Sequence, residues 1–421
     1  MPDIQSIIAQ DAVEPFLQYI RQQGMNRFDL VADADTWQAL GERVCGALAA
    51  KGAEVRTVLL TDDEIIADEE QIVQVMLDGI DPSTVFVAVG SGTITDITRF
   101  VSHRCGRPFI SLPTAPSVDA YSSVNSPLVV RRLKRTVNAQ APLAVFSDLD
   151  TLCAAPRPMV AAGFGDVIGK YVCLADWQLG HLLWDEPYNA EIAADSRRAL
   201  ERVAAQAASI GRLEPEGIRA LMEGLILSGI SMARMGTSSP ASASEHHLSH
   251  YWEMRLLQEN RPAMLHGAKV GCGAVLMAGE YERIRALTRE QALATLEKHA
   301  YPDAETQRRQ IRLAYGSLAE QVTEQHQDYV MLADEGLRAV ETRIAENWDA
   351  IQEIAATVPP ASEIARLLQL AGGVTRPQEL GLGDEEVLLA HRHGHYIRNR
   401  FTVRKLELLL GLSIEESTIR L

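Results

Sequence analysis

The sequence lacks the features of a secreted, a membrane-spanning or a nucleic-acid-binding protein. Its first ten residues, MPDIQSIIAQ, hold no basic segment followed by an apolar one, and no apolar run approaches the roughly 18 residues of a transmembrane helix. Basic residues are outnumbered, because 40 Lys and Arg stand against 56 Asp and Glu. The resulting formal net charge of −16 repels nucleic acid and anionic lipid. We therefore expect a cytoplasmic protein with no nucleic-acid partner and no membrane insertion.

Cysteine is also scarce. Cys45, Cys105, Cys153, Cys173 and Cys272 lie far apart without CxxC spacing, and an odd number cannot pair completely within one chain. We predict buried, reduced thiols with no metal or redox role. The remaining composition, 47% hydrophobic and 23% charged, is typical of a globular protein, and 421 residues leave room for two domains.

Short apolar runs alternate with helical patterns in the first third of the chain, which is typical of parallel strands joined by crossover helices. Helical patterns cover residues 36–50 and 69–77. The run at 84–90 is apolar throughout, which indicates a strand buried on both faces. The predicted strands are 28–33, 54–60, 84–90, 108–114 and 143–150. Together these elements predict a doubly wound, Rossmann-like parallel sheet.

Beyond residue 156 the strand pattern stops, and Ala-, Leu-, Glu- and Arg-rich segments with a period near 3.6 continue to the end of the chain. Groups of helix-breaking residues predict connections between helices at 163–165, 238–240, 259–263 and 358–360. The predicted fold class is therefore α/β plus all-α, with an α/β domain over 1–155 followed by a helical domain over 156–421.

A glycine loop follows the strand predicted at 84–90. In Gly90-Ser91-Gly92-Thr93, with Asp96 further on, glycine places no Cβ where a ligand must approach, and the start of the next helix offers backbone N–H groups to a diphosphate. The loop is not the GxGxxG of the ordinary dinucleotide fold, and the same pattern also suits a simple tight turn. A nucleotide site is thus one of two interpretations of this loop.

Three segments of the helical part combine acids with imidazoles: 163–170, 244–250 and 265–271. On a helix His246 and His250 share one face, whereas His247 points about 100° away. Asp166, His246 and His266 would provide one carboxylate and two imidazoles, a set suited to a divalent transition metal with an open position. The alternative is a capping aspartate and core histidines satisfied by hydrogen bonds.

Six phrases in one order carry a family resemblance. They are Gly90-Ser91-Gly92-Thr93 with Asp96; 113–120; 163–166 with Lys170, Asp176 and Trp177; 244–247 with Ser249 and His250; His266-Gly267 with Lys269 and Val270; and 398–403. With them the chain resembles the metal-dependent polyol dehydrogenases of the iron-alcohol dehydrogenase and glycerol dehydrogenase superfamily, which has a dehydroquinate synthase-like fold. Within that superfamily it is similar to the sn-glycerol-1-phosphate dehydrogenase family, in particular its bacterial branch.

The resemblance implies a reaction and a set of site residues. It implies an N-terminal nucleotide-binding domain, a C-terminal metal-binding domain and reversible reduction of dihydroxyacetone phosphate with NADH or NADPH, in a homodimer. Asp166, His246 and His266 are then the ligands of one divalent ion, which is Zn²⁺ in many relatives and Ni²⁺ in some bacterial ones. Asp119 lies near the substrate, and His250 relays a proton. The nucleotide binds Gly90, Ser91, Gly92, Thr93, Asp96, Thr114 and Ser117.

Two assignments rest on charge. Asp33 ends the first predicted strand, where one interpretation is a carboxylate that accepts hydrogen bonds from the adenosine ribose and repels the 2′-phosphate of NADP, which favours NAD. Asp62 and Asp63 are rival positions, and the alternative for each of the three is a solvated turn acid. The substrate phosphoryl group needs cationic donors, and the candidates are Lys170, ranked first, and Lys134, Arg135, Arg398 and Arg400. Alternatives are a dehydrogenase acting on an unphosphorylated polyol, a cyclase related to dehydroquinate synthase, and a non-catalytic nucleotide- or metal-binding regulator.

Overall fold

The computed structural model describes residues 4–62, 64–78, 81, 83–130, 133–412 and 414, and the chain divides into two compact units. The first, called the sheet unit here, comprises Met1–Val167, Arg198–Ser238 and Leu370–Gly372. The second, called the helical unit, comprises Ile168–Arg197, Ser239–Gln369 and Gly373–Leu421. Each unit is described by itself.

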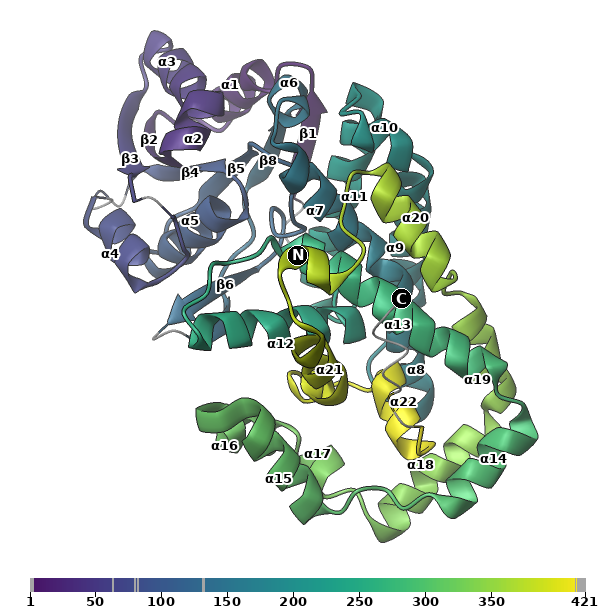
Figure 1. The fold of residues 1–421 in the computed structure, drawn as a ribbon. Coiled ribbons are helices and arrows are strands. Elements are labelled where there is room, and N and C mark those ends of the chain that lie inside the picture. The colour runs from purple at the N-terminus through teal and green to yellow at the C-terminus, as the bar shows by residue number, and fades with distance from the viewer. Residues whose placement is uncertain are drawn as a thin grey trace. The chain divides into compact units, whose positions relative to one another are not determined.

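A six-stranded parallel sheet forms the centre of the sheet unit (Figure 1). Its strand order is β1-β8-β5-β4-β2-β3, and a separate antiparallel hairpin pairs β6 with β7. The strands are β1 (Gln5–Ala9), β2 (Arg27–Asp33), β3 (Glu54–Leu60), β4 (Val85–Gly90), β5 (Phe109–Pro113), β6 (Asn125–Val130), β7 (Leu133–Asn138) and β8 (Ala144–Asp148). The predicted parallel, Rossmann-like sheet is therefore confirmed.

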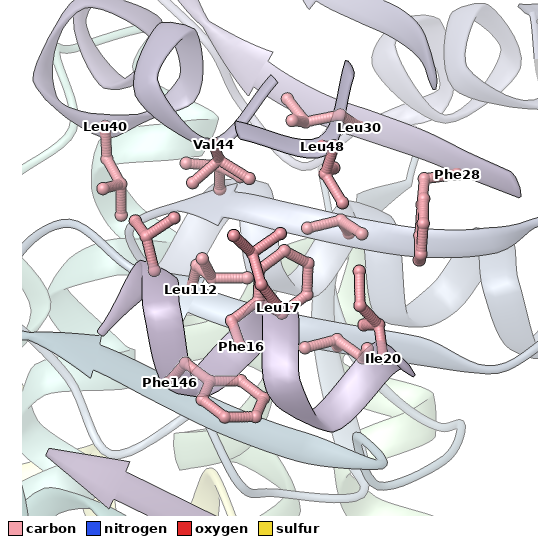
Figure 2. Close-up of a cluster of buried hydrophobic side chains, with 14 of the residues drawn as sticks. Phe16, Leu17, Ile20, Phe28, Leu30, Leu40, Val44, Leu48, Leu112 and Phe146 are labelled. Atoms are coloured by element: carbon pink, nitrogen blue, oxygen red, sulfur yellow. The ribbon is translucent and has the colours of Figure 1, made fainter. Parts of the chain in front are cut away.

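Helices cover both faces of this sheet, which explains why β4 is apolar throughout. Val87 belongs to one buried cluster and the adjacent Phe86 to another on the opposite face, because side chains alternate along a strand. Figure 2 shows the first cluster, in which Phe16 and Leu17 of α1 meet strand residues such as Phe28. Helices of the sheet unit are α1 (Val13–Gln22), α2 (Ala34–Thr36), α3 (Glu42–Ala50), α4 (Glu69–Asp78), α5 (Gly92–Arg104), α6 (Leu149–Cys153), α7 (Arg157–Ile168), α10 (Ala207–Gly211) and α11 (Pro215–Met235), with a π-helical turn η1 (Trp37–Gly41).

One predicted strand needs correction, and three strands were not predicted. The strand predicted at 143–150 ends at Asp148, because the Asp148 carboxylate accepts a hydrogen bond from the Thr151 backbone N–H at 3.0 Å and caps α6. The sequence pattern missed β1, whose five residues are largely exposed or half-buried. It also missed the β6–β7 hairpin.

The described part of the chain beyond residue 156 is helical, as predicted. The remaining helices are α8 (Lys170–Trp184), α9 (Ala190–Ala205), α12 (Ser244–Gln258), α13 (His266–Ala286), α14 (Arg289–Lys298), α15 (Ala304–Tyr315), η2 (Gly316–Leu318), α16 (Ala319–Gln325), α17 (Gln327–Val330), α18 (Asp334–Glu346), α19 (Trp348–Ala356), α20 (Ala361–Leu370), η3 (Pro377–Leu380), α21 (Asp384–His393), η4 (Gly394–Tyr396) and α22 (Val403–Leu409). The connections predicted at 238–240, 259–263 and 358–360 are confirmed.

The connection predicted at 163–165 is wrong, because these residues lie inside α7. Glycine is needed there for close packing and not for a turn: a Cβ on Gly163 would lie 1.8 Å from the carbonyl oxygen of Pro116. The backbone of α7 therefore packs directly on the loop after β5.

One helical stretch corrects the expectation about long apolar segments. By length and composition alone, Arg157–Trp184 is long and apolar enough to cross a membrane, with a mean hydropathy of 1.2 in its most apolar window. In the structure 83% of that window is buried inside the protein, which is typical of a core helix.

Candidate active site

The glycine loop lies at the point where the strand order of the sheet reverses. From β2 the chain first adds β3 on one side and then β4 on the other side, and β2 pairs with β4 in parallel. Asp33 ends β2 and Gly90 ends β4, so both lie at the carboxyl edge of the sheet. Open α/β sheets bind ligands at such a switch point.

The loop places the start of a helix at this edge. Helix α5 begins at Gly92 with Ser91 as its N-cap, and its first turn holds no acidic residue. The unpaired N–H groups and the dipole of a helix start favour an anion. Glycine is required at Gly90, since a Cβ there would lie 2.6 Å from the Ile94 Cβ. These features suit a diphosphate.

The loop after β5 lies beside the glycine loop. The Thr114 backbone N–H donates to the Gly90 carbonyl oxygen at 3.2 Å, and a Cβ on Gly92 would come within 2.8 Å of the Val118 side chain. Ser117 is buried, with its hydroxyl 3.1 Å from the Tyr121 hydroxyl. The structure thus brings together the two loops to which the sequence assigned nucleotide binding.

Asp96 has a structural partner. Its carboxylate accepts a hydrogen bond from the buried Arg99 guanidinium at 2.7 Å, and Arg99 also donates to the backbone carbonyls of Ala120, Tyr121 and Asn125. Burial lowers the pKa of Arg99, although Asp96 opposes this shift. The pair therefore fixes the loop that carries Asp119.

The rival ribose carboxylates differ in their surroundings. Asp33 Oδ1 accepts hydrogen bonds from the Thr36 backbone N–H at 2.8 Å and from the Thr36 hydroxyl at 2.9 Å, which caps α2. Asp62 is exposed and accepts a hydrogen bond from Gln71. Asp63 lies outside the described residues. The capping bonds hold the Asp33 carboxylate in one orientation at the switch point.

Asp119 and Asp166 are joined within the sheet unit. The Asp119 backbone N–H donates to Asp166 Oδ2 at 3.1 Å, and the Ser228 hydroxyl donates to Asp119 Oδ2 at 2.6 Å. Asp166 is fully buried near the end of α7. The Asp166 carboxylate, a metal ligand suggested by the sequence, therefore binds the backbone of Asp119, which the sequence predicts to lie near the substrate.

In the helical unit three imidazoles form one cluster. His246 and His250 lie one turn apart on α12, and His266 is the first residue of α13. Their ring centroids are 5.2 Å apart for His246 and His266, 5.5 Å for His250 and His266, and 5.9 Å for His246 and His250. His247 is also buried, but on another face of α12, as its rotation of about 100° from His246 predicts.

Glu245 orients the His246 ring. Its buried carboxylate lies 2.6 Å from His246 Nδ1, so that Nδ1 carries the proton and Nε2 keeps a lone pair. A carboxylate behind a histidine in this way fixes the tautomer of metal-binding imidazoles. The sequence analysis missed this residue, although a carboxylate next to a candidate ligand was a visible signal.

Asp176 fixes the start of α12. Its carboxylate accepts hydrogen bonds from the Ser244 N–H at 3.0 Å and from the Tyr281 hydroxyl and the Val403 N–H, both at 2.7 Å. Burial raises the pKa of Asp176 to about 7, although these donors oppose the shift. One carboxylate on α8 therefore ties α12 to α13 and α22, and it holds the imidazole cluster in place.

His250 has two charged neighbours that sequence reasoning did not combine. Arg398 Nη2 lies 3.2 Å from His250 Nε2, and Glu253 lies 3.5 Å from His250 Nδ1. Because an arginine can only donate, Nε2 accepts and Nδ1 bears the proton that faces Glu253. Glu253 follows His250 by three residues, so the helical pattern alone offered a signal.

His250, Glu253 and His266 also meet the spacing of a metal site, since one ligand atom of each lies within 4.8 Å of the others. Two cations argue against that use. Lys269 Nζ lies 3.6 Å from Glu253, and Arg398 already donates to His250. We therefore interpret this group as a chain of charged contacts beside the cluster.

The phosphate candidates are spread over both units. In the helical unit Lys170 is buried at the start of α8, Arg398 contacts His250, and Arg400 donates to the Ser242 carbonyl oxygen. In the sheet unit Arg135 is exposed on β7, and the Lys134 side chain lies outside the described residues. Arg398 is the candidate with a direct contact to the imidazole cluster.

Comparison with known proteins first defines the class. The family described as iron-containing alcohol dehydrogenase matches residues 7–156. The structure of glycerol dehydrogenase from Schizosaccharomyces pombe is similar, with a TM-score of 0.62 and 15% identity over 99% of this chain and 89% of that chain. Sulfoacetaldehyde reductase from Bifidobacterium kashiwanohense, solved with NAD+, has a TM-score of 0.60 and 15% identity, covering 99% and 98%. The chain has the fold of the iron-containing alcohol dehydrogenases.

Sequence relatives then define the family within that class. A protein named glycerol-1-phosphate dehydrogenase, NAD(P)+, from Geobacillus stearothermophilus is 37% identical over 407 residues, which cover 96% of this chain and 92% of that protein. One of the same name from Bacillus subtilis is 35% identical over 94% of this chain and 89% of that protein. The chain belongs to the glycerol-1-phosphate dehydrogenase family of NAD(P)-dependent oxidoreductases.

Proposed function

We propose that this chain interconverts dihydroxyacetone phosphate and sn-glycerol 1-phosphate with NAD(P)H and NAD(P)+. The observation that carries this proposal is family membership over nearly the whole chain. The reaction needs a metal site and a nucleotide site. The His246–His266 pair supports the first, and the two neighbouring loops at the switch point of the sheet support the second. No contact among the described residues favours an unphosphorylated polyol over the substrate for which the relatives are named.

Asp166, His246 and His266 are the proposed metal ligands. The chain passes from Asp166 through Gly169 into α8, which contacts both α12 and α13, the helices that carry the two imidazoles. One carboxylate and two imidazoles fit Zn²⁺ or Ni²⁺, and the Glu245 contact leaves His246 Nε2 as a ligand atom. When bound, such an ion acts as a Lewis acid that makes the C2 carbonyl of the substrate more electrophilic.

The sheet unit holds the nucleotide in this proposal. The N–H groups at the start of α5, with Gly90, Ser91, Gly92 and Thr93, face the diphosphate, and Thr114 and Ser117 border it. Asp96 acts through Arg99 by fixing the loop that carries Asp119. Asp33 accepts hydrogen bonds from the ribose, which favours NAD over NADP.

His250 is the proposed proton donor. Because Arg398 contacts Nε2, the edge of the ring proposed for proton transfer is Nδ1, which lies beside Glu253. An imidazole titrates near neutral pH and suits this task. Asp119, held by Ser228, orients the substrate hydroxyl groups.

Arg398 and Lys170 are the proposed contacts of the phosphoryl group, with Arg400 as a further candidate. A guanidinium binds phosphate oxygens through two N–H groups, and Arg398 already lies beside the proposed proton donor.

The division of the chain predicted from the sequence, with the nucleotide bound by residues 1–155 and the metal by residues 156–421, belongs to the same proposal. So do a cytoplasmic location and a homodimer.

The test compares metal content with turnover. After reconstitution with Zn²⁺ or Ni²⁺, the purified chain should oxidise NADH with dihydroxyacetone phosphate, and Asp166→Asn should lose both bound metal and turnover. His181→Ala is a matched control, because His181 is exposed and stacks on Tyr188 away from the cluster. Full turnover by Asp166→Asn with a stoichiometric ion would remove Asp166 from the ligand set.

A further inference from the structure

A buried lysine outside the proposed active site lacks a hydrogen-bond partner. Lys405 on α22 is 2% exposed, and its Nζ makes no hydrogen bond with any described residue. It lies 3.9 Å from the ring centroid of Tyr329 and 5.2 Å from that of Tyr396. The ring faces attract the ammonium, but they do not replace the acceptors that its three N–H groups require.

Other polar atoms around Lys405 also lack a hydrogen-bond partner among the described residues. Both ring nitrogens of His395 and the hydroxyl of Tyr329 are buried without a hydrogen bond to the described residues. The His395 ring lies 3.9 Å from that of Tyr396. These residues come from η4 and α22, which are near neighbours in the sequence, and from α17, which lies more than 60 residues earlier. Buried polar groups are nearly always hydrogen-bonded, so a cluster of exceptions indicates a bound group.

Charge distinguishes between the kinds of group. Burial is the largest cause that lowers the pKa of His395. Four nearby bases lower it further: Lys405, Arg404, His393 and His326. Burial alone lowers the pKa of Lys405. Glu407, a carboxylate on the same helix, already binds Arg404 and Arg283. The carboxylates of Glu186 and Asp328 act on Tyr329, whose pKa they raise beyond the effect of burial, whereas the charged groups that act on His395 are all bases. Among the described residues no carboxylate acts on Lys405, so positive charge is in excess beside its ammonium.

We propose that Lys405, His395 and Tyr329 form a buried site for one small monovalent anion of halide size. Such an anion accepts hydrogen bonds from the ammonium, the imidazole and the phenol at once, and it compensates the buried charge. Burial of every member leaves no room for a large metabolite. The anion holds η4 and the start of α22, between which lies the segment with Arg398.

Bromide is the probe, because it replaces chloride and scatters anomalously. Crystals of the metal-loaded protein soaked in sodium bromide should show an anomalous peak beside Lys405 Nζ. Ordered water without anomalous signal at that position would overturn the proposal. This experiment uses the natural chain, so it is decisive even where a substitution prevents folding.

A solution experiment excludes binding that occurs only at crystal concentration. In sodium chloride the unfolding temperature should exceed that in sodium gluconate of equal ionic strength by about 2 °C or more. Lys405→Met should abolish the difference, whereas Lys298→Met, at an exposed position on α14, should keep it. An equal difference in Lys405→Met, or stabilisation by inorganic phosphate but not by chloride, would contradict the assignment. Turnover is not part of either readout, so failure here leaves the proposed function untouched.

Discussion

The two units build their sites from different parts of the chain. In the sheet unit the candidate nucleotide site consists of backbone N–H groups and glycines at the ends of adjacent strands, as at Gly90. In the helical unit the candidate catalytic site consists of buried polar side chains such as His246, oriented by buried charges such as Glu245. A backbone site depends on where the chain turns, whereas a side-chain site depends on which distant residues meet.

This difference predicts different costs of substitution. A change in the glycine loop alters the space that a ligand can enter and leaves the helical unit intact. A change in the helical unit removes one member of a hydrogen-bonded set, and the remaining buried partners lose their compensation.

Removal of an imidazole should give the largest effect. His266→Ala should lower bound metal and kcat/KM together, the latter by on the order of 1,000-fold, because a Lewis acid contributes several kcal/mol to the transition state. Metal analysis and steady-state kinetics on the same preparation measure both quantities. Stoichiometric metal with undiminished turnover would exclude His266 as a ligand.

A methyl group in the glycine loop should weaken nucleotide binding and lower stability but leave the metal in place. In Gly90→Ala the new Cβ meets Ile94 at 2.6 Å, so we expect a loss of about 1–3 kcal/mol of stability and a clear rise in the KM for NADH at unchanged metal content. Gly46→Ala is the control, since a Cβ there meets nothing within 4 Å and Gly46 lies inside helix α3; it should stabilise by about 0.5–1 kcal/mol. An unchanged KM for NADH would move the diphosphate elsewhere.

The buried Lys405 should make stability depend on pH. Burial lowers its pKa to about 7, whereas an unfolded lysine titrates near about 10.4. Between these values the unfolded chain binds the extra proton, so the free energy of unfolding rises with pH. In halide-free buffer the rise from pH 7 to pH 9 should exceed that of Lys405→Met by about 1–2 kcal/mol. The prediction is contradicted if urea denaturation gives the same rise in the free energy of unfolding with pH for both proteins. Chloride should reduce the difference between them, because it keeps the Lys405 ammonium charged.

The contact between Glu253 and His250 should give the smallest effect. Glu253→Ala should lower kcat by about tenfold with the KM for NADH and the metal content unchanged, since the ring loses the partner that holds its Nδ1 proton. Glu253→Gln should restore part of kcat, because its amide oxygen still accepts from Nδ1. Glu259→Ala is the control, at a surface ion pair with Arg255. If Glu253→Ala keeps the kcat of the natural chain, Glu253 has no role in positioning His250.

Local pattern sufficed for much of the fold. The strand at 54–60 was predicted with the bounds that the structure has, because its signal lies in consecutive residues. Strand β1 was missed because it is short and becomes a strand by pairing with β8, more than 130 residues away in sequence. Gly163 was taken for a breaker, because nothing in the sequence shows that α7 packs against Pro116.

The same limit applies to the site. The helical spacing of His246 and His250 is visible in the sequence, and the structure confirms that both lie in one cluster with His266. The contact between His250 and Arg398 joins residues 148 positions apart, so no local pattern contains it. The role of Asp176 as a common acceptor for three helices depends in the same way on tertiary packing.

The central claim is the phosphorylated triose substrate. The most direct measurement is NADH oxidation by the metal-reconstituted protein with dihydroxyacetone phosphate and, in parallel, with dihydroxyacetone, followed by chiral analysis of the product. The account predicts strong preference for the phosphate and formation of sn-glycerol 1-phosphate. Reaction with dihydroxyacetone alone, or formation of the opposite enantiomer, would contradict it.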